Sequence, residues 1–297
     1  MHVSVVIISK DERQLATTLT ALGRQRSEHH FETVVVDASD GRLADVAAAH
    51  PAVRWIDFTA PAGKAVTIPE QRNAGIAAAR ADVIVFVDAG CEPAGGWLDA
   101  LLAPIAEGRE LVTVGGRYGS DGRYLLRPTE PHHVRDAPTM NMAIHRAALE
   151  RIGGFDERFA YGSDVDFCWR AADAGFGVLM VTGADMRTDW GGARRQWRRA
   201  WQYGEARARL YVKHPRRLPE LPRHDPILLA YPLYLLGLPL ALRHRAYLLL
   251  LAVPLWRQRR DRPFVMLLDR FAYSAGALAF LAQRGASGRQ LRMRGRP

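Results

Sequence analysis

The stretch ADVIVFVDAGCEP, residues 81–93, places a continuous apolar run directly before an aspartate, Asp88. An apolar run without alternation is typical of a strand that is covered on both faces of its sheet. The Ala-rich stretch at residues 69–80 predicts a helix before this strand. Helices that alternate with buried strands indicate a parallel α/β sheet, whose ligands bind beyond the carboxyl ends of the strands. We therefore expect Asp88 at a ligand-binding edge.

The same alternation extends outward from this stretch in both directions. Apolar runs predict further strands at residues 3–8, 31–36, 53–58, 111–118, 140–145 and 178–181. Helical spacing of apolar residues predicts helices at residues 14–26, 44–50, 97–106, 146–152 and 165–174. Asp37 follows the strand predicted at residues 31–36, so we expect it at the same edge as Asp88.

Composition and charge limit the class of protein. The 297 residues are 48% hydrophobic, which is enough for a sizeable core and argues against global disorder. The net charge is +10, and basic residues are concentrated at 194–223 and 243–296, which suggests an anionic partner, either nucleic acid or anionic lipid. Cys91 and Cys168 form neither a disulfide framework nor a zinc site. The first apolar run is too short for a signal peptide, which favours a cytoplasmic location for this part.

Three acidic motifs carry the candidate chemistry. They are VVVDASDG (34–41) with Asp37, IVFVDAGCEP (84–93) with Asp88, and AYGSDVDFCWRAADAGF (160–176) with Asp164. A carboxylate at a strand end accepts hydrogen bonds from a nucleotide or holds a divalent cation, since Mg²⁺ and Mn²⁺ prefer hard oxygen ligands. Each motif alone also fits an ordinary structural use, as a loop cap, a turn cap or a first-turn helix carboxylate.

The order and spacing of four stretches resemble the family 2 glycosyltransferases, which are inverting enzymes with the GT-A fold. The stretches are SVVIISKDE (4–12), VVVDASDG (34–41), EQRNAGIAAARADVIVFVDAGCEPAGGWLDALL (70–102) and MNMAIHRAALERIGGFDERFAYGSDVDFCWRAADAGF (140–176). The resemblance implies an α/β domain of the GT-A type, in which helices flank a Rossmann-like, mainly parallel sheet.

The resemblance also implies roles for single residues. Asp164 corresponds to the catalytic carboxylate of the family, and Asp88 corresponds to the first carboxylate of its DxD motif, which holds Mg²⁺ or Mn²⁺. Residues implied on the nucleotide-sugar side are Ser9, Asp11, Glu12, Asp37, Arg72, Asn73 and Asp88. Residues implied on the acceptor side are Asn141, Gly154, Phe155, Asp156 and Asp166.

The sequence departs from the family pattern at three places. Gly90 stands where DxD has its second carboxylate, and Glu92 is the nearest candidate to replace it. Ser163 replaces the acidic neighbour of the catalytic carboxylate, and Thr188 stands where a histidine often follows the last strand. These departures weaken the case for metal binding more than the case for base catalysis. QWRRAW (196–201) is similar to the QxxRW motif of processive synthases with one residue too many, and an amphipathic basic helix explains it equally well.

The C-terminal part has a different composition. We expect a catalytic domain at residues 1–212 and a helical extension at residues 213–297 that ends in a mobile basic tail. Arg243-His244-Arg245 separates the uncharged run 226–242 from the apolar run 246–256, a pattern that predicts a helical hairpin on an anionic membrane surface. The alternative is a pair of buried helices that pack on the catalytic domain or on a second subunit.

One function is preferred from these observations. We expect inverting transfer of a sugar from a nucleotide-sugar donor to an acceptor hydroxyl of a lipid-linked or cell-envelope glycan. The protein would be peripheral or hairpin-anchored at the cytoplasmic face of the membrane, with a cytoplasmic protein as the alternative. A catalytically silent, membrane-associated binding protein is a second class, and another nucleotide-binding α/β enzyme is a third. The chain contains no GxGxxG turn or Walker loop that would support the third, and no nucleic-acid-binding module explains its arginines.

Overall fold

The computed structural model describes residues 1–60, 65–119, 124–188, 193–251, 256 and 263–294. The chain divides into two compact units, Met1–Asp189 and Trp190–Pro297. The sequence analysis placed the boundary after residue 212, at the end of α7 (Ala193–Lys213). The structure groups α7 with the second unit because this helix packs along α12 (Pro263–Arg294).

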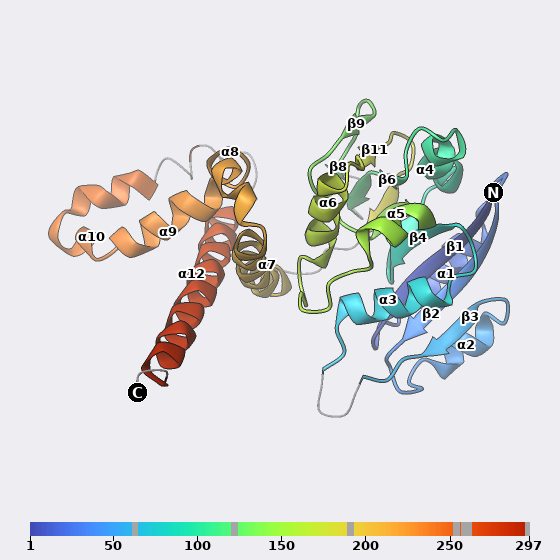
Figure 1. Ribbon diagram of the computed structural model, residues 1–297, viewed down its shortest axis with the longest axis horizontal. Helices are drawn as coiled ribbons and strands as arrows, with labels where there is room; N and C mark the ends of the chain where they lie inside the picture. Colours follow the sequence, from blue (N-terminus) through green and yellow to red (C-terminus); the bar gives the residue numbers. More distant parts are fainter. Residues whose placement is uncertain (61–64, 120–123, 189–192, 252–255, 257–262, 295–297) are drawn as a thin grey trace. The chain divides into compact units, whose positions relative to one another are not determined.

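The first unit is built on an eight-stranded sheet whose elements alternate as the sequence predicts (Figure 1). Its parallel half consists of β1 (His2–Ser9), β2 (His30–Asp37), β3 (Arg54–Asp57) and β4 (Val83–Asp88). The other half consists of β10 (Asn141–His145), β6 (Val112–Val114), β11 (Leu179–Met180) and β9 (His132–His133). The order is β3-β2-β1-β4-β10-β6-β11-β9, and β10 runs antiparallel to both of its neighbours.

Helices cover both faces of this sheet. They are α1 (Leu15–Gly23), α2 (Ala44–Ala49), α3 (Ile68–Ala78), α4 (Trp97–Ala106), α5 (Arg146–Ile152) and α6 (Ser163–Asp173). Val5 and Ile7 of β1 lie in a core with α1 and α4, whereas Val6 lies in a second core with α5 and α6. Successive strand residues are therefore both buried, and this is why the strand is a continuous apolar run in the sequence.

A second, smaller sheet corrects two of the predictions. Its strands are β5 (Glu92–Pro93), β12 (Met186–Thr188), β7 (Arg117–Gly119) and β8 (Tyr124–Leu126). The single strand predicted at residues 111–118 is two strands in two sheets, and the chain passes between them at Gly115. A Cβ at Gly115 would overlap the carbonyl oxygen of Ala184, so the backbones approach too closely for any other residue. The strand predicted at residues 178–181 is not the last of the unit, because β12 follows it.

The second unit is helical. Its further elements are η1 (Pro215–Glu220), α8 (Leu221–His224), α9 (Ile227–Gly237), α10 (Leu240–Arg243) and η2 (Arg245–Leu251). The pair α7 and α12 meets at two glycines: a Cβ at Gly204 would overlap the Tyr273 carbonyl oxygen, and one at Gly276 would overlap the Trp201 carbonyl oxygen. The helical extension predicted at residues 213–297 ends in a basic tail, and α12 continues into this tail as far as Arg294.

Replacing Gly204 with alanine is expected to destabilise the second unit by about 1–3 kcal/mol, the usual cost of overpacking a close contact. Thermal unfolding followed by circular dichroism measures the change. Gly23→Ala is the matched control, because nothing lies within 4 Å of a Cβ at this end of α1. An unchanged unfolding temperature for Gly204→Ala would contradict the close contact between α7 and α12.

Candidate active site

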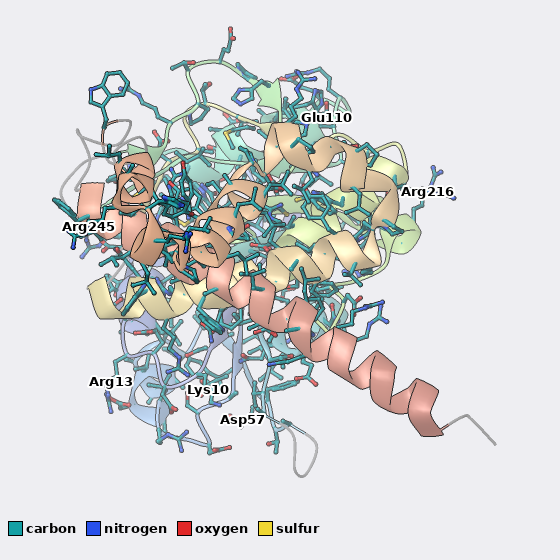
Figure 2. The ribbon with its side chains drawn as sticks, turned by 90° about the vertical axis from the view of Figure 1, so that its left-hand side faces the viewer. Lys10, Arg13, Asp57, Glu110, Arg216 and Arg245 are labelled. Atoms are coloured by element: carbon teal, nitrogen blue, oxygen red, sulfur yellow. The ribbon has the colours of Figure 1, made fainter. Side chains whose placement is uncertain are left out.

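The carboxyl ends of the parallel strands bring polar residues to one edge of the sheet. Ser9 ends β1, Asp37 ends β2 and Asp57 ends β3, and the three residues stand at the same register position. Asp88 ends β4, on the other side of β1. Neighbouring strands lie about 4.8 Å apart, so the backbones at Asp37 and Asp88 are about 10 Å apart. Figure 2 shows Lys10, which follows β1, and Asp57 at the same end of the unit.

The Asp37 carboxylate is buried and held by a hydroxyl group. Ser39 Oγ donates a hydrogen bond to Asp37 Oδ1 at 2.6 Å. Burial raises the pKa of Asp37 above its ordinary value, the Ser39 hydroxyl opposes this shift, and the Asp57 carboxylate adds to it. Ser39 Oγ also accepts a hydrogen bond from the Asp11 N–H at 2.7 Å. Ser9, Asp11 and Asp37 therefore form one polar cluster.

Asp11 and Glu12 follow β1 at the rim of this cluster. The Asp11 carboxylate pairs with Arg42 at 2.5 Å, and the hydrogen bond from Arg42 lowers the pKa of Asp11 below its ordinary value. The Glu12 carbonyl oxygen accepts a hydrogen bond from the Leu15 N–H at 3.0 Å, so its backbone helps to begin α1. The Glu12 side chain is half-buried.

Helix α3 is tied to the same edge by a residue that the sequence analysis did not single out. The helix begins at a capping box between Thr67 and Glu70. Gln71 is buried, and its Nε2 donates to the carbonyl oxygens of Ser9 at 2.8 Å and Val36 at 3.0 Å. A glutamine in an Ala-rich helix carries no sequence signal of burial. Through Gln71, α3 is attached to the ends of β1 and β2.

Arg72 is the buried cation of the site. Its side chain is 7% exposed, and its Nη2 lies 3.2 Å from Oδ1 of Asp88, whose side chain is 42% exposed. The guanidinium lies over the ring of Phe155, 5.6 Å from the ring centre. Phe155 in turn packs edge to face on Phe86 and against Phe167. A guanidinium keeps its charge when it is buried, so Arg72 presents a fixed positive charge beside Asp88.

Asp164 lies in the first turn of α6 and is half-buried. Its Oδ1 accepts a hydrogen bond from the Val165 N–H at 2.9 Å. Burial raises the pKa of Asp164 above its ordinary value, Arg72 and the Val165 N–H lower it, and the Asp88 carboxylate raises it further. Asp164, Arg72 and Asp88 are thus within range of direct electrostatic interaction. These three residues, which are far apart in the sequence, form the centre of the site.

Asn73 holds the GGFDE turn, residues 153–157, against α3. Its Nδ2 donates to the Phe155 carbonyl oxygen at 2.8 Å and to Glu157 Oε1 at 2.9 Å, and its Oδ1 accepts from the Phe155 N–H at 2.8 Å. The resemblance implies contact between Asn73 and the sugar nucleotide, whereas the structure uses its amide to fix Phe155 under Arg72. Asn73 is therefore a positioning residue in this structure.

Three of the residues implied on the acceptor side also support the turn. Asp166 is fully buried and pairs with Arg170 Nε at 2.8 Å. Arg170 Nη2 donates to the Gly154 carbonyl oxygen at 2.7 Å, so the ion pair secures the start of the turn. Asp156 of the turn pairs with Arg158, the residue that follows the turn, at 2.7 Å.

Asn141 is buried between the two sheets of the first unit. Its Nδ2 donates to the carbonyl oxygens of Gly116 at 2.9 Å and Ala184 at 2.8 Å, and its Oδ1 accepts from Trp97 Nε1 at 2.7 Å. Both amide hydrogens are used, and the residue is 2% exposed. The structure gives Asn141 a packing role, and the acceptor contact that the resemblance implies stays a prediction.

The turn after Asp88 explains the missing second carboxylate. Gly90 has φ 89°, its N–H donates to Thr18 Oγ1 at 2.8 Å, and a Cβ there would lie 2.6 Å from Gln14 Oε1. This left-handed conformation disfavours a side chain, and the end of the Gln14 side chain would also have to move. An aspartate at position 90 would therefore be strained.

The side chains around Asp88 determine whether a divalent cation fits there. Glu92 does not replace the missing carboxylate, because it pairs with Arg187. Over the described part of the chain, no group of three or more His, Cys, Asp and Glu side chains is placed to hold a metal ion. Asp88 is a single, half-exposed carboxylate, which fits a cation that keeps phosphate oxygens and water as its other ligands.

The other two departures lie at buried positions. Ser163 is 2% exposed and follows Gly162, which has φ 78°. An acidic side chain at position 163 would be buried beside Asp164, and two neighbouring buried carboxylates repel each other. Thr188 is 6% exposed and ends β12. A charged side chain would be costly to bury at either place.

Asn73→Asp is expected to loosen the turn, because a carboxylate cannot donate to the Phe155 carbonyl oxygen and repels Glu157. We expect a loss of about 1–3 kcal/mol in the free energy of unfolding, the cost of leaving a buried acceptor unsatisfied. The KM for a bound sugar nucleotide should rise, since Arg72 loses its support. Thermal unfolding and donor titration measure both quantities. Glu157→Gln is the control and should change neither much, and a fully stable Asn73→Asp variant with unchanged KM would refute the positioning role.

Two family sequence models match the chain. The sequence model of the family described as Glycosyl transferase family 2 matches residues 4–170, and that of Glycosyl transferase family group 2 matches residues 129–282. The chain is 32% identical over 193 residues to the pre-mycofactocin glycosyltransferase of Mycobacterium tuberculosis, in the strains CDC 1551 / Oshkosh and ATCC 25618 / H37Rv. The match covers 56% of this chain and 39% of the relatives, so this chain spans well under half of their length.

Solved structures share the fold. The mannosyltransferase PcManGT from Pyrobaculum calidifontis, in complex with GDP-Man and Mn²⁺, has a TM-score of 0.69 at 17% identity, covering 94% of this chain and 86% of that chain. GalNAc-T7 with UDP, GalNAc and Mn²⁺ has a TM-score of 0.54 at 16% identity, covering 74% of this chain and 51% of that chain. At these identities the likeness concerns the fold alone, and it confirms the predicted α/β architecture of the GT-A type.

Proposed function

The chain belongs to glycosyl transferase family 2, and from this premise we propose that it transfers a sugar from a nucleotide-sugar donor to a hydroxyl group of an acceptor. The observation that carries the proposal is one buried guanidinium, Arg72, that interacts with the two carboxylates Asp88 and Asp164. Glycosyl transfer needs positive charge at the leaving diphosphate and a base at the acceptor hydroxyl. This arrangement offers both.

In the proposed reaction, the acceptor oxygen attacks the anomeric carbon of the sugar. The bond from that carbon to the diphosphate breaks, and its electron pair passes to the phosphate oxygen. Asp164 takes the proton of the acceptor hydroxyl, while Arg72 offsets the negative charge of the departing diphosphate. Attack from the side opposite to the leaving group inverts the anomeric configuration.

The donor is proposed to be a nucleoside diphosphate sugar held at the strand edge. The cluster of Ser9, Asp11 and Asp37 offers acceptors for the hydrogen-bond donors of a base or a ribose. The two solved structures with this fold that bind GDP-Man or UDP support the same class of donor.

A divalent cation, Mg²⁺ or Mn²⁺, is proposed to bind at Asp88 together with the donor. When bound, it would supply further positive charge at the diphosphate. The two neighbours that contain Mn²⁺ support this, and the single half-exposed carboxylate suits a cation shared with phosphate oxygens.

The acceptor is proposed to be a lipid-linked or cell-envelope glycan, and the proposed location is the cytoplasmic face of a membrane. The support comes from the second unit, where leucines such as Leu233 and Leu242 and the basic residues Arg243 and Arg245 are all exposed. A membrane surface would bring such a protein to an acceptor that is itself bound to lipid.

A catalytically silent binding protein is the second candidate, and one observation favours it. The left-handed turn at Gly90 leaves the DxD position with one carboxylate. Incubation with UDP-, GDP- and dTDP-sugars in the presence of Mn²⁺ separates the two candidates, since an enzyme releases nucleoside diphosphate from at least one of them. Ligand-induced thermal stabilisation without any release would favour the silent protein.

Asp164→Asn is expected to lower kcat by at least about 100-fold, because an amide cannot accept the acceptor's proton. Binding of the nucleoside diphosphate should be almost unchanged, since Asp164 lies on the acceptor side of the proposed reaction. Asp173→Asn is the matched control, because it makes the same substitution at the exposed end of the same helix. A fully active Asp164→Asn variant would remove Asp164 from the role of base.

The rate is expected to fall as the pH falls through the pKa of Asp164, because a protonated carboxyl group cannot act as the base. Burial raises this pKa, so the acid limb of kcat/KM should lie above 3.8, the ordinary value for aspartate. Initial rates of donor consumption across the acid range give the limb. An acid limb at or below the ordinary value would show that Asp164 is not the titrating base.

A further inference from the structure

Helix α9 is apolar on two opposite faces, and only one of them is covered within its unit. On the covered face, Tyr231 is 6% exposed and packs edge to face on Phe271 of α12, with ring centres 5.6 Å apart. The uncovered face carries Leu229, Leu233 and Leu236, which are 44%, 68% and 66% exposed. Their spacing of four and three residues places them in one stripe along the helix.

The chain turns back after α9 and extends this apolar surface. Figure 1 shows α9 and α10 leading away from the α7–α12 pair before the chain returns through η2. The return is fixed by Tyr247, whose hydroxyl donates to the Tyr234 carbonyl oxygen at 2.9 Å. Leu240, Leu242 and Leu249 are 55%, 92% and 71% exposed in this part. Soluble proteins rarely leave so large a run of exposed leucines in contact with water.

Basic residues stand at the turn of this hairpin, Ile227–Leu251. Arg243, His244 and Arg245 are all exposed, and Figure 2 shows Arg245 at one side of the unit. The sequence contains no Asp or Glu between Asp225 and Asp261. The hairpin therefore combines exposed leucines with positive charge and no negative charge, which is the composition of a segment that binds an anionic lipid surface.

One helix of the described chain, α12, is long and apolar enough over Phe264–Gly285 to cross a membrane by length and composition. This stretch packs closely along α7: Gly204 meets Tyr273, and Trp197 Nε1 donates to the Leu268 carbonyl oxygen at 3.0 Å. Helix α7 carries several arginines and is strongly basic. A membrane-spanning α12 would take these charges into the hydrocarbon or break the contact, and both are costly.

Helix α9 is too short to span. Its 11 residues extend about 16 Å, roughly half the thickness of a bilayer core. We propose that the hairpin Ile227–Leu251 lies in the interface of an anionic bilayer, with the exposed leucines named above among the acyl chains and Arg243 and Arg245 at the phosphates, while α12 stays outside. This inference deepens the membrane location proposed above and rests on it, and it names the contact surface.

Vesicle flotation of the full chain tests the inference. We expect binding to vesicles in which phosphatidylglycerol replaces part of the phosphatidylcholine, and weak binding to phosphatidylcholine alone. Leu233→Glu and Leu242→Glu should each lower the binding constant by about tenfold or more, the loss expected when one inserted leucine is removed. Leu218→Glu is the matched control, because Leu218 is 50% exposed in η1, outside the hairpin, and should bind like the unchanged chain.

Two further measurements test the alternatives, which are that α12 binds the membrane or that a second copy of the chain covers the hairpin. Leu281→Glu replaces a leucine of α12 that is 49% exposed, and it should leave flotation unchanged. Flotation that is lost in Leu281→Glu but kept in Leu233→Glu and Leu242→Glu would overturn the inference in favour of α12. A dimer that dissociates in the hairpin variants, without vesicle binding by the unchanged chain, would show that a second copy covers the surface and would also overturn it.

Donor consumption in the absence of vesicles separates this inference from the proposed function. The hairpin variants should consume the donor at the rate of the unchanged chain, since none of the substituted residues belongs to the site. A chain that binds vesicles through the hairpin without consuming any donor would keep the inference and refute the proposed transfer. A chain that consumes the donor and fails to bind anionic vesicles would keep the proposed transfer and refute the membrane-binding hairpin.

Discussion

The structure of the site depends on one buried charge, the guanidinium of Arg72. A charged group that is withdrawn from water is costly unless opposite charge lies nearby, and Asp88 supplies that charge directly. Asp164, in the first turn of α6, interacts electrostatically with the same guanidinium. The strand end that offers Asp88 and the helix that offers Asp164 are therefore coupled through a single side chain of α3. Burial raises the pKa of Asp164, and the charge of Arg72 opposes this shift.

The position of Arg72 is set by neutral contacts as well as by charge. Phe155 supports the guanidinium, and Asn73 fixes the backbone of Phe155 from the residue next to Arg72. The ion pair between Asp166 and Arg170 secures the other end of the same turn. The GGFDE turn is thus a support for the cation, and five of the residues implied to contact ligands take part in it: Asn73, Gly154, Phe155, Asp156 and Asp166. Fixed supports of this kind reduce the reorganisation that a site needs during a reaction.

The sequence predicts the ligand-binding edge of the sheet well. It predicts the short strands and the side-chain hydrogen bonds around that edge poorly. Asp37 and Asp88 each follow an uninterrupted apolar run, and such runs indicate buried parallel strands whose ends meet at one edge. The strands β5 and β12 are only two and three residues long, which is too short for any periodic signal. Hydrogen-bond partners leave no trace in a single sequence, so the backbone contacts of the Asn73 and Asn141 amides could not be predicted. The left-handed conformation of Gly90, which disfavours an aspartate at this position, is visible only in the structure.

The central claim is that the leaving diphosphate and the base occupy opposite sides of one sugar. The stereochemistry of the first product tests it most directly. Proton NMR of a donor that is being consumed, with water or a glycan as acceptor, reports the anomeric configuration before the free sugar equilibrates. The account predicts that the newly formed product has the configuration opposite to that of the donor. A product that first appears with the configuration of the donor would contradict a single displacement assisted by Asp164.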